Sequence, residues 1–258
     1  MKILGRTQMI PGVTIEEAIH CIKGLGFDGV EIGIVNREFQ IRDEFFEEGF
    51  VQRIKKCLQE NELKYYSVGG HMDFTEKEEI LELLKKAIVI TRELGAEVMI
   101  INGARRYEEI SFEEQWNKQV ECVKQLCAVA EENNIYLAVE FEPDFVVDST
   151  LSLMKLFEEV NSPVLKMNAD IGHMFLQDAD PMEALDICGE YIVHAHVENM
   201  GMGVHDHLVP YKGDMDLKAY LQKLKAVGFD GTASLDLYKY DYVEVSPKSL
   251  AYLREIGA

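Results

Sequence analysis

The sequence has few cysteines and no long apolar run. Five cysteines occur in 258 residues, and no two have the Cys-x-x-Cys spacing of a zinc or redox site. We interpret them as small buried hydrophobes in a reducing compartment. No apolar run approaches the roughly 20 residues that span a bilayer, and the N-terminal stretch lacks a long apolar signal region. We therefore expect a cytoplasmic protein without a membrane partner.

Basic residues are also scarce. The chain carries 26 Lys and Arg against 46 Asp and Glu, for a net charge of −20. Binding to a phosphate backbone is driven mainly by Lys and Arg contacts, so the composition disfavours a nucleic-acid partner unless a local basic patch exists. Bases pair only at Lys55-Lys56, Lys85-Lys86 and Arg105-Arg106, and each pair is flanked by acids. We expect a small-molecule substrate instead.

Linkers, close repeats and a dinucleotide fingerprint are missing as well. No Pro/Gly/Ser-rich segment divides the chain, so we expect one domain over residues 1–258. No Gly-x-Gly-x-x-Gly follows the first expected strand, which disfavours a dinucleotide-binding sheet.

Eight strand–helix alternations fill the chain. Several expected strands are almost entirely apolar, as in a parallel sheet that is covered on both faces. Capping-box spacing at Thr14, Thr75 and Ser111 marks three helix starts. Eight such units in about 250 residues predict an α/β fold, a single (β/α)8 TIM barrel, with a doubly wound open sheet as the runner-up. The strands are expected at 2–8, 29–34, 63–68, 97–102, 135–141, 164–170, 192–197 and 232–237.

Four ionisable residues stand at the ends of consecutive expected strands: Glu140, Asp170, His196 and Asp236. In a barrel these ends share one face, where active sites form. Three carboxylates and an imidazole suit a divalent cation and not a thiolate-seeking metal. We expect Mn²⁺ first, with Mg²⁺, Co²⁺ or Zn²⁺ as alternatives. Taken singly, each acid could be an ordinary surface residue; the conjunction in apolar surroundings favours the metal site, because buried carboxylates need a partner charge.

Further polar residues could contact a substrate. His173 lies one turn beyond Asp170 and is the first candidate to bind a substrate oxygen. His71 and Asn102 follow the third and fourth expected strands, and His205 and His207 lie in a long loop after the seventh. For each, the alternative is an ordinary loop or surface side chain.

The chain resembles the xylose-isomerase-like TIM barrels, the broad group of sugar phosphate isomerases and epimerases. The resemblance rests on motifs in order along the chain: Gly26-Phe27-Asp28-Gly29-Val30-Glu31-Ile32, Leu137-Ala138-Val139-Glu140, Asp170-Ile171-Gly172-His173, Ile192-Val193-His194-Ala195-His196-Val197 and Gly228-Phe229-Asp230-Gly231-Thr232-Ala233-Ser234-Leu235-Asp236.

In that family the metal is held by Glu, Asp, His and Glu on strands five to eight. Glu140, Asp170 and His196 match, whereas Asp236 stands where the family usually has Glu. In the ketose epimerases of the group the two Glu are also the acid/base pair, so the shorter Asp236 is either the second acid/base group or only a ligand. The family's substrate-gripping Arg after the seventh-strand His is unmatched. Members often form homo-oligomers, although no segment here demonstrates one.

The resemblance implies a metal-dependent isomerase or epimerase acting on a ketose, sugar phosphate or keto-polyol. Proton transfer next to the carbonyl would pass through an enediolate, with Glu140 as the first choice of base and Asp236 opposing it. One alternative is a lyase, such as a keto-inositol dehydratase. Another is a non-catalytic carbohydrate-binding barrel. Phosphodiester cleavage, as in the apurinic endonuclease branch, is disfavoured by the net charge of −20.

Overall fold

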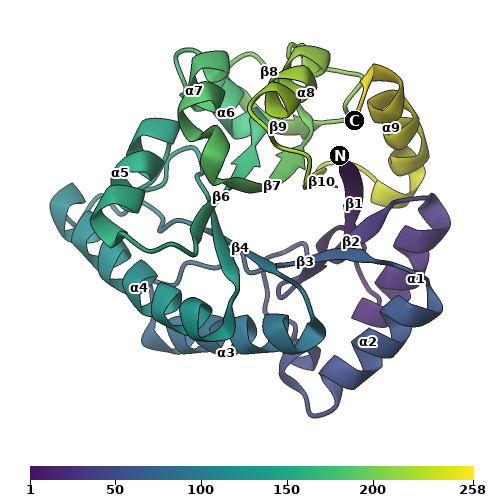
Figure 1. The fold of residues 1–258 in the computed structure, drawn as a ribbon, viewed down its shortest axis with the longest axis horizontal. Helices are drawn as coiled ribbons and strands as arrows, with labels where there is room; N and C mark the ends of the chain where they lie inside the picture. The colour runs from purple at the N-terminus through teal and green to yellow at the C-terminus, as the bar shows by residue number, and fades with distance from the viewer.

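Apolar strands alternate with amphipathic helices along the whole chain, and this alternation produces one closed ring of eight parallel strands with helices outside it (Figure 1). The computed structural model describes all 258 residues. The ring confirms the predicted (β/α)8 TIM barrel and excludes the open sheet. Its strands are β1 (Lys2–Arg6), β2 (Gly29–Gly33), β3 (Tyr65–Gly69), β4 (Val98–Asn102), β5 (Tyr136–Glu140), β6 (Leu165–Asp170), β7 (Ile192–Val197) and β10 (Thr232–Leu235).

The helices follow the strands in the predicted alternation, except that two short helices and not one follow β6. The α-helices are α1 (Ile15–Leu25), α2 (Phe50–Glu60), α3 (Glu78–Leu94), α4 (Phe112–Asn133), α5 (Thr150–Val160), α6 (Ile171–Gln177), α7 (Pro181–Cys188), α8 (Leu217–Ala226) and α9 (Tyr242–Ile256). Short 3-10 turns are η1 (Thr7–Met9), η2 (Asp43–Phe46) and η3 (Gly189–Tyr191). None of the helices is both long and apolar enough to cross a membrane.

Two of the three predicted helix starts are correct. Thr14 forms a full capping box with Glu17, and the Ser111 side chain accepts the Glu114 N–H. The prediction at Thr75 is wrong, because the N-cap of α3 is Lys77, two residues later, and the helix begins at Glu78. The Thr75 hydroxyl instead donates to Asp73 Oδ1 at 2.7 Å, so it stabilises the loop that precedes the helix.

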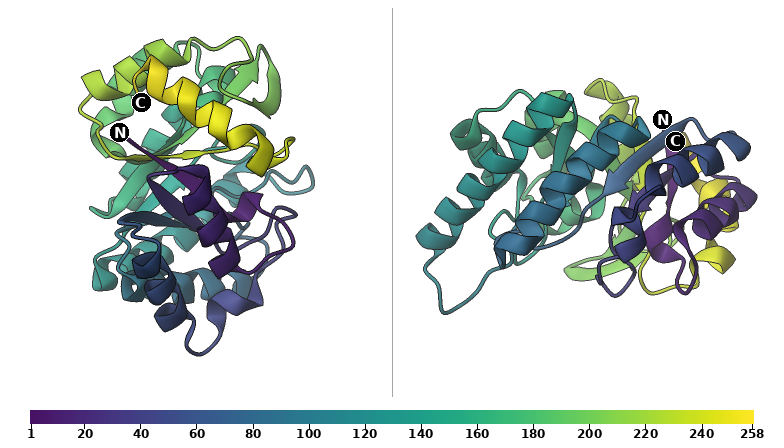
Figure 2. Two further views of the ribbon diagram at one scale, coloured as in Figure 1. Left: turned by 90° about the vertical axis from the view of Figure 1, so that its right-hand side faces the viewer. Right: turned by 90° about the horizontal axis from the view of Figure 1, so that it is seen from below.

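The ring closes between the two ends of the chain. β1 pairs with β2 on one side and with β10 on the other, where Ile3 lies opposite Ala233. Every neighbouring pair in the ring is parallel, so all eight carboxyl ends share one face of the barrel. The two chain ends lie close together near the opposite face (Figures 1 and 2), and the Met1 ammonium pairs with Asp230 at 2.9 Å.

An antiparallel ribbon interrupts the long segment after β7, which the sequence analysis treats as a loop. β8 (Asn199–Gly201) pairs with β9 (Val204–Leu208), and both strands contact α6. The turn between them is Met202-Gly203, with Gly203 at φ 70°, a left-handed conformation that glycine adopts without strain. The ribbon matters for function because it carries His205 and His207.

Candidate metal centre and substrate cavity

The four residues predicted as metal ligands meet at the carboxyl face of the barrel. Glu140 and Asp170 end β5 and β6, His196 lies in β7, and Asp236 follows β10 by one residue. The Nδ1 atom of His196 lies 3.0 Å from Glu140 Oε2, 3.7 Å from Asp236 Oδ2 and 3.8 Å from Asp170 Oδ2. All four side chains are buried, and one ligand atom from each lies within 4.8 Å of the other three.

A hydrogen bond to Glu31 orients His196 so that its Nδ1 atom faces the ring. Its Nε2 atom lies 2.9 Å from Glu31 Oε2, and a carboxylate can only accept, so Nε2 carries the hydrogen. Nδ1 faces the three carboxylates without a well-formed hydrogen bond, and Asp170 Oδ2 has no hydrogen-bond partner either. A bound cation would replace the proton that these carboxylates favour on Nδ1. A carboxylate that orients a ligating imidazole in this way is a common feature of metal sites. The donor set fits a divalent cation that prefers oxygen and imidazole nitrogen.

Burial and mutual repulsion displace the acidities of these groups. Burial and then Glu140 raise the pKa of Asp170 to about 6. Burial would raise the pKa of Glu140 too, but His196 and His71 outweigh it and hold that pKa well below its usual range. The Glu140 and Glu31 carboxylates raise the pKa of His196 against the opposing effect of burial. Glu140 is therefore ionised, and a cation would displace protons from its neighbours.

A buried arginine lies directly beside the ring, and the sequence analysis did not anticipate it. Arg6 ends β1, and its guanidinium is 2.9 Å from Glu31 Oε1 and forms an ion pair with Asp236 Oδ1. Burial would lower the pKa of Arg6, but Asp236 and Glu31 together raise it. One arginine thus neutralises part of the negative charge of the ring and occupies one oxygen of Asp236.

Glu140 is held on several sides. Asn168 Nδ2 donates to its Oε2 at 2.7 Å, and Nε2 of His71 lies 3.3 Å from the same oxygen. His194 Nδ1 contacts Asn168 Oδ1 at 2.8 Å, which makes it a supporting residue within the barrel. Burial lowers the pKa of His194 to about 3, so this imidazole is neutral. The Oε1 atom of Glu140 is less engaged and lies 3.7 Å from Nδ1 of His173.

Three histidines converge next to the ring: His173, His205 and His207. His173 Nδ1 donates to the Phe141 carbonyl at 2.9 Å, so its Nε2 is an acceptor when the ring is neutral. His205 Nε2 lies 2.9 Å from His173 Nε2 and 2.8 Å from His207 Nε2. One imidazole nitrogen takes part in only one such hydrogen bond, so the cluster leaves at least one nitrogen free for a substrate oxygen or a cation. The structure brings all three predicted histidines to the site.

Glu198 is a second residue that the sequence analysis missed. It follows β7, is fully buried, and accepts the Gly172 N–H through Oε1 at 2.8 Å, whereas Oε2 has no partner. Burial and the nearby Asp170 raise its pKa well above the usual range. Its position two residues after His196 was the only signal in the sequence. It forms a further metal-capable group with Asp170, His207 and Asp236.

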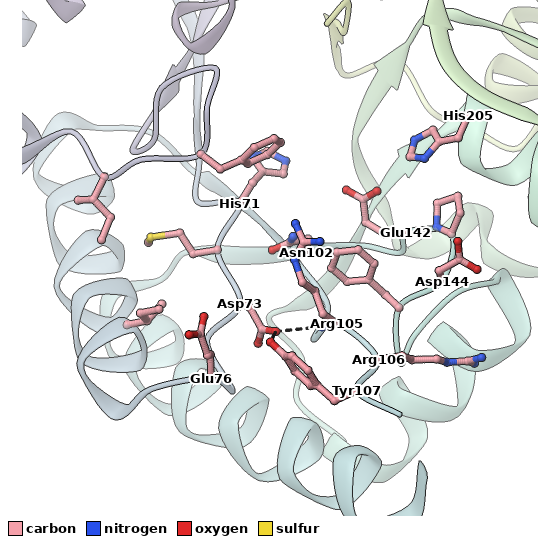
Figure 3. A pocket seen from close by; sticks show the side chains of 16 residues that line it. His71, Asp73, Glu76, Asn102, Arg105, Arg106, Tyr107, Glu142, Asp144 and His205 are labelled. Atoms are coloured by element: carbon pink, nitrogen blue, oxygen red, sulfur yellow. Dashed lines mark hydrogen bonds between the residues drawn. The ribbon is translucent and has the colours of Figure 1, made fainter. Parts of the chain in front are cut away.

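A cavity of about 640 Å³ opens next to the ring and extends over the loops that follow β2 to β5. His71 and Asn102 line it, as the sequence predicts for substrate-contacting residues, and His205 lines it too. Figure 3 shows Asn102 near the middle, with one group of side chains above it and another below: His71, Glu142 and His205 on one side, and Asp73, Glu76 and Tyr107 on the other. The cavity therefore extends from His71, which contacts Glu140 of the predicted metal ring, to an outer wall of loops.

Comparison with known proteins identifies the family to which the chain is similar. The family model described as "Xylose isomerase-like TIM barrel" matches residues 19–256. The 3-dehydroshikimate dehydratase of Bacillus anthracis is 22% identical over 71% of this chain and 65% of that protein, so this alignment spans less than two thirds of the dehydratase. The fructoselysine 3-epimerase of Shigella flexneri is 24% identical over 86% of this chain and 85% of that protein.

A solved structure shares the whole fold. The IolI protein, crystallised with a bound zinc atom, superposes with a TM-score of 0.80 over 99% of this chain and 96% of that chain, at 18% identity. At this identity the likeness supports the barrel fold and leaves the reaction open.

Proposed function

Because the chain belongs to the xylose isomerase-like TIM barrel family, we propose that it is a divalent-metal-dependent enzyme of sugar or polyol metabolism. It moves a proton next to the carbonyl group of a ketose, sugar phosphate or keto-polyol. The observation that carries the proposal is the buried ring of Glu140, Asp170, His196 and Asp236, with a free His196 nitrogen facing three carboxylates. The zinc atom in the IolI structure supports a divalent cation, and Mn²⁺ remains our first expectation.

In this proposal the four ring residues hold the cation. When bound, the cation would act as a Lewis acid that stabilises the enediolate form of the substrate. Glu140 is the proposed base. Its Oε2 is fixed by Asn168 at 2.7 Å, and Oε1 is the freer oxygen and is ionised, ready to accept a proton. His173 is the proposed partner of a substrate hydroxyl through Nε2, because its Nδ1 is fixed on the Phe141 carbonyl; the hydroxyl would replace the contact of Nε2 with His205. His71, Asn102, His205 and His207 complete the substrate-facing surface.

Asp236 has two proposed roles, ligand and opposing acid/base group. Arg6 occupies Oδ1, so only Oδ2 is open to a cation or to a substrate proton. Epimerisation requires proton transfer on both faces of one carbon, whereas an isomerase or a dehydratase can use a single base. The Arg6–Asp236 pair therefore favours a second candidate, a dehydratase acting on a keto-inositol or related polyol. A non-catalytic carbohydrate-binding barrel is the third candidate.

The test begins with metal analysis of protein purified without chelator. The metal-loaded protein is then incubated in D2O with a panel of ketoses, ketose phosphates and keto-inositols, and deuterium uptake at carbon is measured by mass spectrometry. We expect uptake that is abolished by chelation. Uptake that persists after chelation contradicts the mechanism. Loss of water from a keto-polyol identifies the dehydratase, and bound metal without either reaction favours the binding barrel.

The proposed base is tested by Glu140→Gln, which keeps the shape of the side chain and removes its basicity. We expect at least a 10³-fold loss of exchange, in line with the roughly 10²–10⁴-fold contribution of a general base. Glu97→Gln, the same change at an exposed position, serves as the control and keeps full activity. Exchange at the wild-type rate in Glu140→Gln contradicts the assignment.

A further inference from the structure

The substrate cavity is larger than a free monosaccharide requires. A hexose has about 12 non-hydrogen atoms and occupies on the order of 200 Å³, if each atom takes about half the volume of a water molecule. The cavity measures about 640 Å³. Its outer wall contains apolar side chains from two loops, including Phe39, Ile41 and Phe145. The cavity therefore has room for a substituent that extends away from the metal ring.

Most charged side chains in the outer wall already have partners. Arg106 forms a salt bridge with Asp148 at 2.8 Å, and Glu76 lies 3.2 Å from Lys77. Both oxygens of Asp73 are engaged: Oδ1 accepts from the Thr75 N–H and hydroxyl, and Oδ2 accepts from a backbone N–H and the Tyr107 hydroxyl. These groups have little capacity left for a ligand.

Arg105 is different, because its guanidinium lines the cavity without a salt bridge or a hydrogen bond to the protein. The position of the residue is nevertheless well defined. Its backbone N–H is the one that donates to Asp73 Oδ2, at 3.0 Å, and the residue forms an antiparallel bridge with Phe145. The guanidinium carbon lies 5.3 Å from the centre of the Phe145 ring, within the range of a cation–π contact. Arg105 is thus a positioned cation with unused donors.

We propose that Arg105 binds an anionic group, a carboxylate or a phosphate, at the end of the substrate that lies away from the metal ring. This inference rests on the proposed function and specifies its substrate class: a ketose or keto-polyol that carries an acid group. Guanidinium donors match the oxygens of both anions. Arg105 would also take the place of the family's substrate-binding arginine after the seventh strand, which this chain lacks. The cavity lining also contains the acids Glu142 and Asp144, so a neutral or cationic substrate is the competing occupant.

Binding measurements with matched ligands test the assignment. Calorimetric titration of the metal-loaded protein compares D-fructose with D-fructose 6-phosphate, with 5-keto-D-gluconate and with 1-amino-1-deoxy-D-fructose. We expect at least one of the two anionic ligands to bind about tenfold or more tightly than D-fructose, since charge-assisted hydrogen bonds are roughly twice as strong as neutral ones. Tighter binding of D-fructose 6-phosphate indicates a phosphate site, and tighter binding of 5-keto-D-gluconate indicates a carboxylate site. Arg105→Met should reduce this preference to less than about twofold and leave the affinity for D-fructose unchanged.

Arg106→Met is the matched control, because it removes the same charge from the same wall but from a residue that is already paired with Asp148. It should keep the anion preference. The proposal is overturned if neither anion binds more tightly than D-fructose, if the amino sugar binds best, or if Arg105→Met keeps the wild-type preference. These titrations measure binding alone, so a failure of the deuterium-uptake assay would count against the proposed reaction and not against Arg105.

Discussion

At the scale of single residues, the main finding is the ion network beneath the proposed metal ring. Arg6 contacts Glu31 and Asp236, and Glu31 in turn contacts His196. Each of these side chains is nearly inaccessible to water, so none of the charges is solvated. Removing one partner from a buried ion pair is costly because the remaining charge is uncompensated. The site is therefore coupled to the stability of the fold.

Arg6→Met should lower the free energy of unfolding of the metal-free protein by about 3–5 kcal/mol, because Glu31 and Asp236 lose their buried counter-charge. Added Mn²⁺ should restore part of this loss, since the ring becomes more negative without the arginine. Urea unfolding with and without metal measures both effects. Arg254→Met is the control: this arginine is 49% exposed and pairs with Asp28 at 3.5 Å, so its loss should have an effect of about 1 kcal/mol or less. Equal effects of the two changes would contradict the network.

Metal affinity should depend on pH through Asp170. The folded protein holds the pKa of this carboxyl at about 6, above its ordinary value, so the metal-free fold is more stable with Asp170 protonated and loses that advantage as pH rises from about 4 to 6. A cation requires the ionised form. Below pH 6 the affinity for Mn²⁺ should therefore fall about tenfold per pH unit, with proton release on binding.

Calorimetry in two buffers of different ionisation enthalpy measures the protons released on metal binding. In Asp170→Asn the proton release that depends on this carboxyl should disappear. A metal affinity that is constant from pH 5 to pH 7 would rule out this linkage.

At the scale of elements, the junction between β6 and α6 places two functional side chains, Asp170 and His173. Asp170 ends β6 and is also the N-cap of α6, because its Oδ1 accepts the His173 N–H at 2.8 Å. The same carboxylate thus starts a helix with one oxygen and presents the other to the ring. The orientation of His173 depends on this cap, so the junction links the metal ring to the histidine cluster.

Asp170→Ala and Asp170→Asn separate these two roles. Both remove the charge, but asparagine keeps an oxygen that can cap the helix. Without metal, the alanine variant should be less stable than the asparagine variant by about 1 kcal/mol. The same pair of substitutions at Asp180, the N-cap of α7, gives a reference outside the ring. If the two Asp170 variants unfold at the same urea concentration, the cap contributes nothing.

Much of this architecture could be predicted from the sequence because it is local. Apolar runs, glycines and capping residues predict the eight strands, and a shared face for their carboxyl ends brings Glu140, Asp170 and His196 together. The ribbon of β8 and β9 could not be predicted, because Val204 to Leu208 places three polar residues in a row between two apolar ones and so lacks the alternation of a half-buried strand. Arg6 was missed for another reason: its partners Glu31 and Asp236 are defined by the register of three strands, which no local pattern reports.

At the scale of the whole molecule, most of the net charge of −20 lies on side chains outside the core, whereas Arg6 and the ring acids are enclosed. The net charge of the molecule therefore does not predict the charge of the ligand. The anion preference that we propose depends on one local cation, Arg105. The cavity opens on the face where the strands end, and the two chain ends lie near the other face (Figures 1 and 2). Changes at the termini should consequently leave the cavity intact.

The pairing of β1 with β10 determines when the site can form during synthesis of the chain. Arg6 leaves the ribosome 230 residues before its partner Asp236, so no nascent chain that stops before Asp236 contains a complete site. Closure, and not the position of the chain ends, is what the site requires. A circular permutant that joins residue 258 to residue 1 through a short Gly/Ser linker, with new ends in the exposed turn at Gly12, should fold and bind Mn²⁺ like the natural chain, whereas a chain ending at residue 230 should bind none.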